Sequence, residues 1–216
     1  MVYVYSKVVC LFLICLLFNK SRIQALDGNE TDRQSLLAFK KAIMQDPQNA
    51  LISWNDSVHF CQWEGISRGR RHQRVTRIDI TSRDLSGPLS PYVANMSFLQ
   101  TLQINNNSLH GEIPPQLGNL FRLKGLNLFL NNLKGEIPAN ISRCANLQHL
   151  RLGRNNLVGK LPEELGALSK LRSLVIEENS LTGRIPLFLG NFTSLEILYA
   201  TRNHFSGSIP DTIANM

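Results

Sequence analysis

The chain has 216 residues, which is enough for one ordinary domain or for an array of repeats with a cap. Hydrophobic residues make up 43% and charged residues 18% of it, a composition that argues against a disordered chain. Much of the formal net charge of +7 comes from one arginine-rich segment, residues 68–77, and not from an extended basic stripe, so we expect no nucleic-acid partner.

Residues 1–25 have the features of a secretory signal peptide. Lys7 precedes the apolar run VVCLFLICLLF, and Ala25 stands at a suitable cleavage position. The run has 11 residues, whereas a helix that crosses a bilayer needs about 20, so a signal anchor is the less favoured alternative. Cleavage removes three of the 23 basic residues and no acidic ones, which leaves 20 against 16 and a net charge of +4. We expect the protein in the secretory pathway, outside the cell or at its surface.

Secretion would place the cysteines in an oxidising compartment and expose the asparagines to glycosylation. Cys10 and Cys15 leave with the signal peptide, so Cys61 and Cys144 remain in an oxidising route and no larger disulfide framework is available. Six Asn-x-Ser/Thr sequons suit a secreted glycoprotein. These predicted glycosylation sites are Asn29, Asn55, Asn95, Asn106, Asn140 and Asn191.

Residues 26–74 are predicted to form an N-terminal cap with one amphipathic helix. Thr31 and Gln34 fit a capping box at its start, and Asp46-Pro47 is a stop signal at its end. Three apolar residues share one helical face: Leu36, Phe39 and Ile43. Such a helix can cover the exposed edge of the segment that follows.

From residue 75 onward the sequence repeats every 24 residues. The register is set by six glycines at Gly87, Gly111, Gly135, Gly159, Gly183 and Gly207. An apolar residue stands two positions before each glycine, and an Asn two positions earlier in every repeat except the first, which has Arg83. The frame LxxLxLxxNxLxGxIPxxLGxL is a leucine-rich repeat.

Each part of this frame has a structural reason. The alternating apolar pairs predict short strands that stack into a parallel sheet, and the asparagine column can satisfy backbone groups at each turn. Glycine permits the bend that follows, and proline ends the sheet. Further apolar columns close the back of the coil, and we expect Cys144 to be a buried small hydrophobe in one of them. The predicted fold class is α/β: a leucine-rich repeat solenoid with a parallel sheet on its concave face, a helical cap over residues 26–74, and six repeats over residues 75–216, the last one incomplete.

The I-P that follows L-x-G resembles the plant-specific class of leucine-rich repeats, found in plant receptor-like kinases and in secreted polygalacturonase-inhibiting proteins. The cap is similar to that of plant receptors, D-R-x-A-L-L-x-F-K, then S-W-N, then C-x-W-x-G-V-x-C, in residues 32–40, 53–55 and 61–66. With the segment RRHQRVTRIDI, it resembles the group that includes bacterial-peptide immune receptors. The resemblance implies a disulfide from Cys61 to position 68, which is Arg68 here, so we expect a weakened cap.

The resemblance implies a recognition module for a peptide or protein partner, with a co-receptor ectodomain among the possible partners. The candidate ligand-binding residues are those we expect to face solvent on the concave side: Phe129, Leu130, His149, Arg151, Arg154, Glu177, Glu178, Tyr199 and Arg202. Three of them, Arg154, Glu178 and Arg202, share one column, so a structural charge ladder is as good an explanation for them as ligand contact. A glycan on Asn106 would block the early repeats.

No catalytic signature is present, neither HExxH, P-loop, GxSxG nor a kinase motif, and His59, Cys61 and His72 fit no standard metal site. We therefore expect no catalytic residue, metal or cofactor. Because the sequence stops inside the sixth repeat, we expect a truncated ectodomain of a plant receptor-like kinase of defence or developmental signalling, attached to a membrane only through a span absent from this chain. Two alternatives stay open: a secreted inhibitor of a pathogen cell-wall-degrading enzyme, and a soluble co-receptor or decoy.

Overall fold

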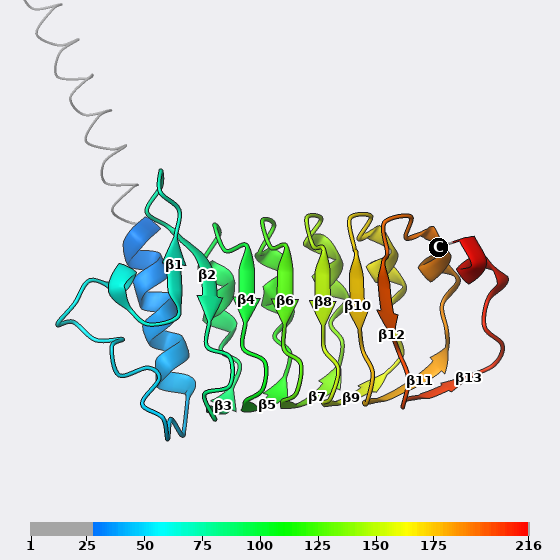
Figure 1. The fold of residues 1–216 in the computed structure, drawn as a ribbon, viewed down its shortest axis with the longest axis horizontal. Helices are drawn as coiled ribbons and strands as arrows, with labels where there is room; N and C mark the ends of the chain where they lie inside the picture. Colours follow the sequence, from blue (N-terminus) through cyan, green and yellow to red (C-terminus); the bar gives the residue numbers. More distant parts are fainter. Residues whose placement is uncertain (1–27, 216) are drawn as a thin grey trace, which may run out of the picture.

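The structure, a computed structural model, describes residues 28–215, so the predicted signal peptide lies outside the described residues. Each repeat forms one turn of a coil, and the turns stack along the long axis of the molecule (Figure 1). One face is a seven-stranded sheet whose strands follow in the order β1 (Ile66–Arg68), β2 (Val75–Asp79), β4 (Thr101–Gln103), β6 (Gly125–Asn127), β8 (His149–Arg151), β10 (Ser173–Val175) and β12 (Ile197–Tyr199). All neighbours are parallel except β1 and β2, which pair antiparallel.

A second parallel sheet runs along the other edge of each turn. Its six strands are β3 (Ser86–Pro88), β5 (Ser108–Glu112), β7 (Asn132–Glu136), β9 (Asn156–Gly159), β11 (Ser180–Arg184) and β13 (His204–Ser206). We expected the repeat glycine only to permit a bend, but it belongs to the strand in β3, β5, β7, β9 and β11, and in the last repeat Gly207 directly follows β13. At Gly135, φ is +78°, and a Cβ there would lie 2.9 Å from Cγ of Glu112 in the neighbouring repeat. Glycine is required because the chain has a left-handed conformation at a point of close contact.

The back of the coil consists of short 3-10 helices, one per repeat: η2 (Pro91–Asn95), η3 (Pro115–Asn119), η4 (Ala139–Arg143), η5 (Glu163–Ala167), η6 (Leu187–Asn191) and η7 (Asp211–Asn215). The predicted apolar columns are buried between these helices and the sheets, as a single continuous core. Cys144 is only 1% exposed, and burial raises the pKa of its thiol to about 11. This confirms its predicted place as a core residue.

The asparagine column bonds the backbone of neighbouring turns, as predicted. Asn155 donates from Nδ2 to the carbonyl oxygens of Leu128 and Leu152, both at 3.0 Å, and its Oδ1 accepts from the Leu133 amide at 3.0 Å. Asn107, Asn131, Asn179 and Asn203 make the same set of bonds. Each asparagine therefore joins its own turn to the preceding one, which is why the repeats stack in a fixed register.

The cap helix occupies residues 28–42 and packs over the first repeat (Figure 1). The predicted capping box is wrong, because Thr31 lies inside the helix and Gln34 Nε2 donates to Glu30 Oε1 at 2.6 Å. A short helix, η1 (Phe60–Gln62), and stacked tryptophan rings complete the cap. Trp54 and Trp63 lie with ring centroids 5.7 Å apart, and both are buried.

A buried ion pair ties the cap helix to the start of β2. The Asp32 carboxylate is fully buried and accepts from Arg74 Nε and Nη2, both at 2.8 Å, and from the Val75 amide at 2.8 Å. Arg74 is thus structural, whereas Arg68, Arg70 and Arg71 are exposed on β1 and its turn. The arginine-rich segment, residues 68–77, therefore does not have one common role, because Arg74 is bonded inside the cap and these three arginines are exposed.

Candidate functional site

The nine candidate residues lie on the solvent side of the seven-stranded sheet, in four consecutive repeats. His149 and Arg151 belong to β8 and Tyr199 to β12, and the other six lie in the turns that follow β6, β8, β10 and β12. Most of the nine are exposed, Tyr199 at 55% and Leu130 at 38%. Phe129, Glu177 and Glu178 are half-buried. The predicted columns therefore form one face, with less free surface at three positions than the sequence suggested.

Phe129 is half-buried because it packs across Gly153 in the next repeat. A Cβ at Gly153 would lie 3.1 Å from the Phe129 ring, so the glycine leaves the space that the ring occupies. The guanidinium of Arg154 lies 5.5 Å from the centroid of the same ring, within reach of a cation-π interaction. The Phe129 ring therefore also packs against the Arg154 side chain. The sequence signal for this contact was Gly153, a glycine at a position that differs from repeat to repeat.

Arg154, Glu178 and Arg202 form the predicted charge ladder across three turns. Arg154 Nε lies 3.3 Å from Glu178 Oε2, and Arg202 Nη1 lies 2.7 Å from Glu178 Oε1. All three have left-handed backbone, with φ of 53°, 51° and 54°. Leu130 and Asn106 in the same column share this conformation, which the sequence pattern did not reveal because the family frame leaves the position variable.

We expect Glu178→Gln to lower the free energy of unfolding by about 1 kcal/mol or less, because both ion pairs are partly exposed. The loss, measured by thermal unfolding, should disappear near 1 M salt, where the Debye length is about 3 Å. A loss that is the same at low and high salt would show that the carboxylate acts through packing and not through charge.

His149 and Arg151 stand in adjacent columns of β8. Burial lowers the pKa of His149, nearby Arg151 and Arg172 lower it further, and Glu196 acts in the opposite direction. The imidazole is therefore neutral at pH 7. Together with Lys124 and Arg77, the two residues line one hollow on the concave face. Glu177 and Glu178 follow one repeat further along and Glu196 two repeats further along, whereas Asp79, on β2, is paired with Arg77.

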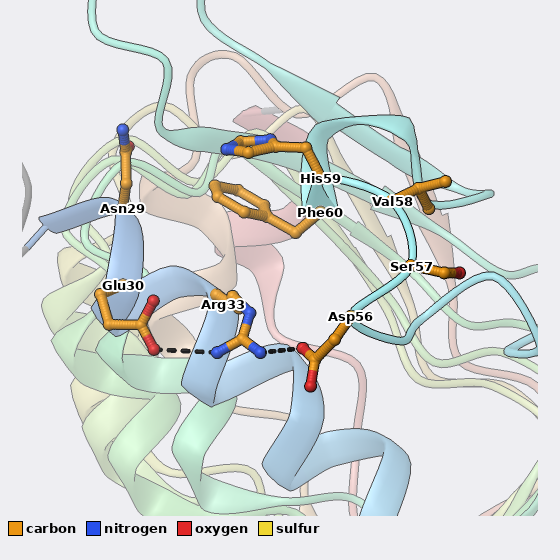
Figure 2. A pocket seen from close by; sticks show the side chains of 8 residues that line it. All are labelled: Asn29, Glu30, Arg33, Asp56, Ser57, Val58, His59 and Phe60. Carbon is orange, nitrogen blue, oxygen red and sulfur yellow. Dashed lines mark hydrogen bonds and ion pairs between the residues drawn. The ribbon is translucent and has the colours of Figure 1, made fainter.

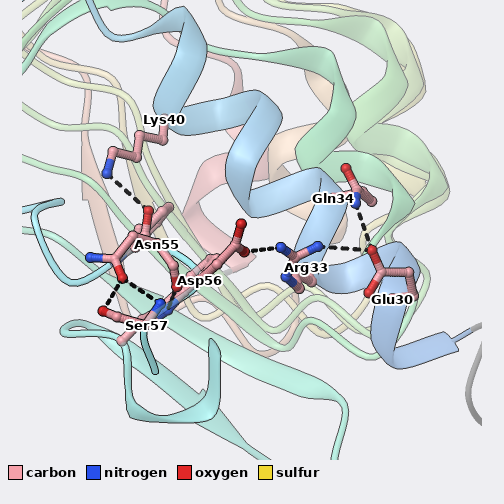
Figure 3. A network of polar contacts seen from close by, with 9 residues as sticks. Glu30, Arg33, Gln34, Lys40, Asn55, Asp56 and Ser57 are labelled. Carbon is pink, nitrogen blue, oxygen red and sulfur yellow. Dashed lines mark hydrogen bonds and ion pairs between the residues drawn. The ribbon is translucent and has the colours of Figure 1, made fainter. Parts of the chain in front are cut away.

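Another hollow lies at the cap and not on the concave face. It has a volume of about 690 Å³ and is lined by Asn29, Glu30, Arg33, Asp56, Ser57, Val58, His59 and Phe60 (Figure 2). Its charges bond one another: Arg33 bridges Glu30 at 2.9 Å and also pairs with Asp56 (Figure 2). The network continues through Gln34 on one side and the Asn55 turn on the other, with Lys40 Nζ donating to the Trp54 carbonyl at 2.9 Å (Figure 3). These bonds close a loop against the helix. Among the described residues that line the hollow, Asn29 keeps a buried Oδ1 that accepts no hydrogen bond.

The predicted glycosylation sites differ in how free their side chains are. Asn95, Asn140 and Asn191 are exposed in the short helices on the back of the coil. Asn29 is half-buried on the cap helix, and Asn55 and Asn106 are exposed. In two cases Nδ2, the atom that would carry a glycan, already donates a hydrogen bond: Asn55 to the Ile52 carbonyl at 2.7 Å and Asn106 to Ser82 Oγ at 2.7 Å. These two sites would lose a bond on glycosylation.

Within residues 28–215, no helix is long and apolar enough to cross a membrane. In the same part of the chain, no three side chains of His, Cys, Asp or Glu are grouped as ligands for a metal ion.

Comparisons with known proteins agree with this architecture. The cap matches the family described as leucine rich repeat N-terminal domain at residues 29–67. The family described as leucine rich repeat matches at residues 98–120, 146–168, 170–192 and 194–216. The crystal structure of the BIR2 ectodomain from Arabidopsis thaliana is 32% identical, with a TM-score of 0.73, and the match covers 82% of this chain and 94% of that one. The curated relatives are receptor kinases. The chain belongs to the leucine-rich repeat family and is similar to plant receptor ectodomains.

Two of the curated receptor kinases show how much of a full-length receptor kinase the chain matches. LRR receptor-like serine/threonine-protein kinase EFR from Arabidopsis thaliana is 40% identical over 102 residues, which is 47% of this chain and 9% of that protein. Receptor kinase-like protein Xa21 from Oryza sativa subsp. japonica is 41% identical over 85 residues, 37% of this chain and 8% of that protein. The matches thus span less than a tenth of either receptor kinase.

Two further solved structures share the solenoid. A plant ice-binding protein is 32% identical, with a TM-score of 0.80 over 86% of this chain and 60% of that one. The Arabidopsis receptor kinase HAESA, in complex with the peptide hormone IDA and the co-receptor SERK1, is 27% identical, with a TM-score of 0.62 over 85% of this chain and 39% of that one. In that complex a receptor kinase of this family holds both a peptide and a second protein.

Proposed function

We propose that this chain is the recognition part of a receptor-like kinase ectodomain and binds a peptide or protein partner outside the cell through its concave face. The observation that carries the proposal is the exposed strip from Phe129 to Tyr199, where aromatic and charged side chains stand on a rigid parallel sheet. Aromatic residues and arginines supply much of the binding energy at protein interfaces. The HAESA complex with a peptide hormone and a co-receptor supports the same use of the fold. A role in defence or developmental signalling is part of this proposal, as is a cell-surface location.

Tyr199 and Arg202 are the residues that we expect to contribute most. Tyr199 is 55% exposed on β12, and the Arg202 side chain is 75% exposed although it pairs with Glu178. An extended peptide that crosses β8, β10 and β12 would contact both. The Arg202 guanidinium can bind a peptide while one of its nitrogens stays with Glu178.

Binding should be tested with peptides selected from a random library against the full chain. Tyr199→Ala and Arg202→Ala should each weaken the selected peptides by about tenfold, the loss typical of an interface anchor. Tyr92→Ala is the matched control, because Tyr92 is 58% exposed in η2, on the opposite side of the coil. If the two concave-face variants bind as well as the Tyr92 variant, the site is misplaced.

A co-receptor-like role is the second candidate, in which the chain docks against a larger ectodomain. The HAESA complex supports it, since a co-receptor, SERK1, is bound there to a receptor that shares the solenoid. Inhibition of a pathogen wall-degrading enzyme remains a further alternative, and no contact in the structure favours it. Co-elution with a receptor ectodomain, lost in the Tyr199 variant or retained in it, would show whether docking uses the concave face.

A further inference from the structure

A hollow of about 310 Å³ lies on the concave face over β4, β6 and β8. Gly125 lines it and is itself buried. This glycine pairs with Thr101 on one side and with His149 on the other, both of which carry side chains. Gly125 does not have a positive φ. A Cβ at this position would lie 3.6 Å from Thr101 Cγ2, which is an ordinary van der Waals contact. The backbone conformation therefore does not require glycine at this position. The missing side chain leaves open space. We call this hollow the Gly125 notch.

Basic side chains surround the Gly125 notch: Arg77, Lys124, His149 and Arg151. Arg77 is paired with Asp79 at 2.6 Å. Among the described residues, Lys124, His149 and Arg151 take part in no ion pair, and Glu196, the acid that acts on His149, is itself paired with Arg172 at 3.2 Å. The walls therefore carry positive charge that no carboxylate of residues 28–215 neutralises by direct contact.

The Asn127 amide in the notch is already bonded. Asn127 Nδ2 donates to Gln103 Oε1 and to Asn105 Oδ1, both at 3.0 Å, and Asn127 Oδ1 accepts from the Phe129 amide at 3.2 Å. The lining residues that offer donors to a ligand are therefore the cationic Lys124 and Arg151, together with the uncharged Thr101 and Gln103. Cationic donors in a half-enclosed site bind a charged acceptor more strongly than a neutral one.

We propose that the Gly125 notch binds a carboxylate of an extended peptide that lies across the concave face, with Lys124 and Arg151 as the donors and the missing side chain of Gly125 as the space. The inference rests on the proposed peptide-binding function. A volume of about 310 Å³ is at the lower limit of small-molecule sites, so it fits one side chain or one chain end and not a whole ligand.

Occupation of the notch has a consequence for His149. Arg151 and Arg172 oppose its protonation and Glu196 favours it, and Lys124 lines the same hollow. A bound carboxylate adds a negative charge and raises the pKa of His149. By linkage, affinity for the carboxylate rises as the pH falls through the pKa of His149 and falls as the imidazole loses its proton.

The test measures the His149 pKa by NMR of the histidine rings in the full chain, with the His149→Asn variant to identify the resonance. Three probes are used: a blocked pentapeptide of glycine with a central glutamate, the same peptide with glutamine, and a glycine pentapeptide with a free carboxyl end. We expect at least one of the two carboxylate peptides to raise the His149 pKa and to bind about fivefold or more tighter than the glutamine peptide. Which of the two acts identifies the carboxylate as a side chain or a chain end. Equal effects of all three probes, or none, would overturn the proposal.

Gly125→Met places a side chain in the notch without backbone strain, and Gly125→Ala is its matched control. The methionine variant should bind the active probe about tenfold more weakly and the alanine variant nearly as well as the unchanged chain. If Gly125→Met does not fold, Arg151→Gln removes one donor instead and should weaken the active probe by a similar factor. Unchanged affinity in the folded variant contradicts the site. Library peptides that bind in a Tyr199-dependent way, yet do not distinguish glutamate from glutamine, would refute the notch and leave the proposed function intact.

Discussion

Asp32→Ala is expected to lower the free energy of unfolding of the cap by about 3 to 5 kcal/mol, the largest loss that we predict for this chain. The carboxylate is fully buried and is bonded to two nitrogens of Arg74 and to the Val75 amide. Alanine would leave a guanidinium whose side chain is 15% exposed without its counter-charge, and a buried amide without an acceptor. The cost comes mainly from these two uncompensated groups and not from the attraction that is lost.

The two tryptophans allow the cap to be followed separately from the repeats. Trp54 and Trp63 are the only tryptophans of the chain, and both are in the cap, so their fluorescence during denaturation reports cap unfolding. Circular dichroism reports the strands of the repeats together with the cap helix, residues 28–42. We expect the fluorescence midpoint of Asp32→Ala to fall well below that of the unchanged chain, with a smaller change in circular dichroism, because solenoid repeats gain stability mainly from their neighbours.

Asp56→Asn is the matched control for the buried ion pair. Asp56 pairs with Arg33, but its side chain is 81% exposed, so its loss should cost about 1 kcal/mol or less. Asp32→Asn should fall between the two, because an amide oxygen can still accept from the Val75 amide. Similar losses in Asp32→Ala and Asp56→Asn would mean that the buried pair does not hold the cap in place.

The features that could be predicted from the sequence are those that recur in every repeat. The sheet on the concave face, the buried apolar columns and the asparagine bonds each appear six or nearly six times in one register. Repetition also placed Arg154, Glu178 and Arg202 in one column, because a shift of 24 residues equals one step between neighbouring turns.

The features that could not be predicted either occur only once in the chain or depend on glycine, which has no side chain. The bond between Asp32 and Arg74 joins residues 42 apart with no repeated pattern to relate them. The second sheet was missed because its strands contain the glycine that usually marks a bend, and its backbone bonds leave no apolar alternation. The Gly125 notch was missed because a glycine at a variable position looks like a neutral substitution until its neighbours in adjacent turns are known.

Arg68→Cys is expected to form a disulfide with Cys61 and to stabilise the cap by about 2 to 3 kcal/mol, the value that loop entropy gives for a closed loop of about eight residues. The plant receptor cap that this chain resembles has its second cysteine at this position. Cys61 is a free, half-buried cysteine in η1, and η1 contacts β1, whose last residue is Arg68. Arg68 is exposed, and no ion pair of the described residues involves it, so its removal should cost little.

The bridge should be visible as a mass lower by two hydrogens and as a higher fluorescence midpoint that returns to its original value under reducing conditions. Arg68→Ser separates the loss of the arginine from the gain of the bridge and should leave the midpoint nearly unchanged. Because β1 is the outer strand of the seven-stranded sheet and pairs antiparallel with β2, a bridge from η1 to its end would fix the cap to the first repeat next to the Asp32 and Arg74 pair. The stabilisation should therefore be larger in the Asp32→Ala background, where that other connection is missing, than in the unchanged chain. If no disulfide forms, Cys61 and position 68 are not neighbours, and the assignment of the cap register from the resemblance is wrong.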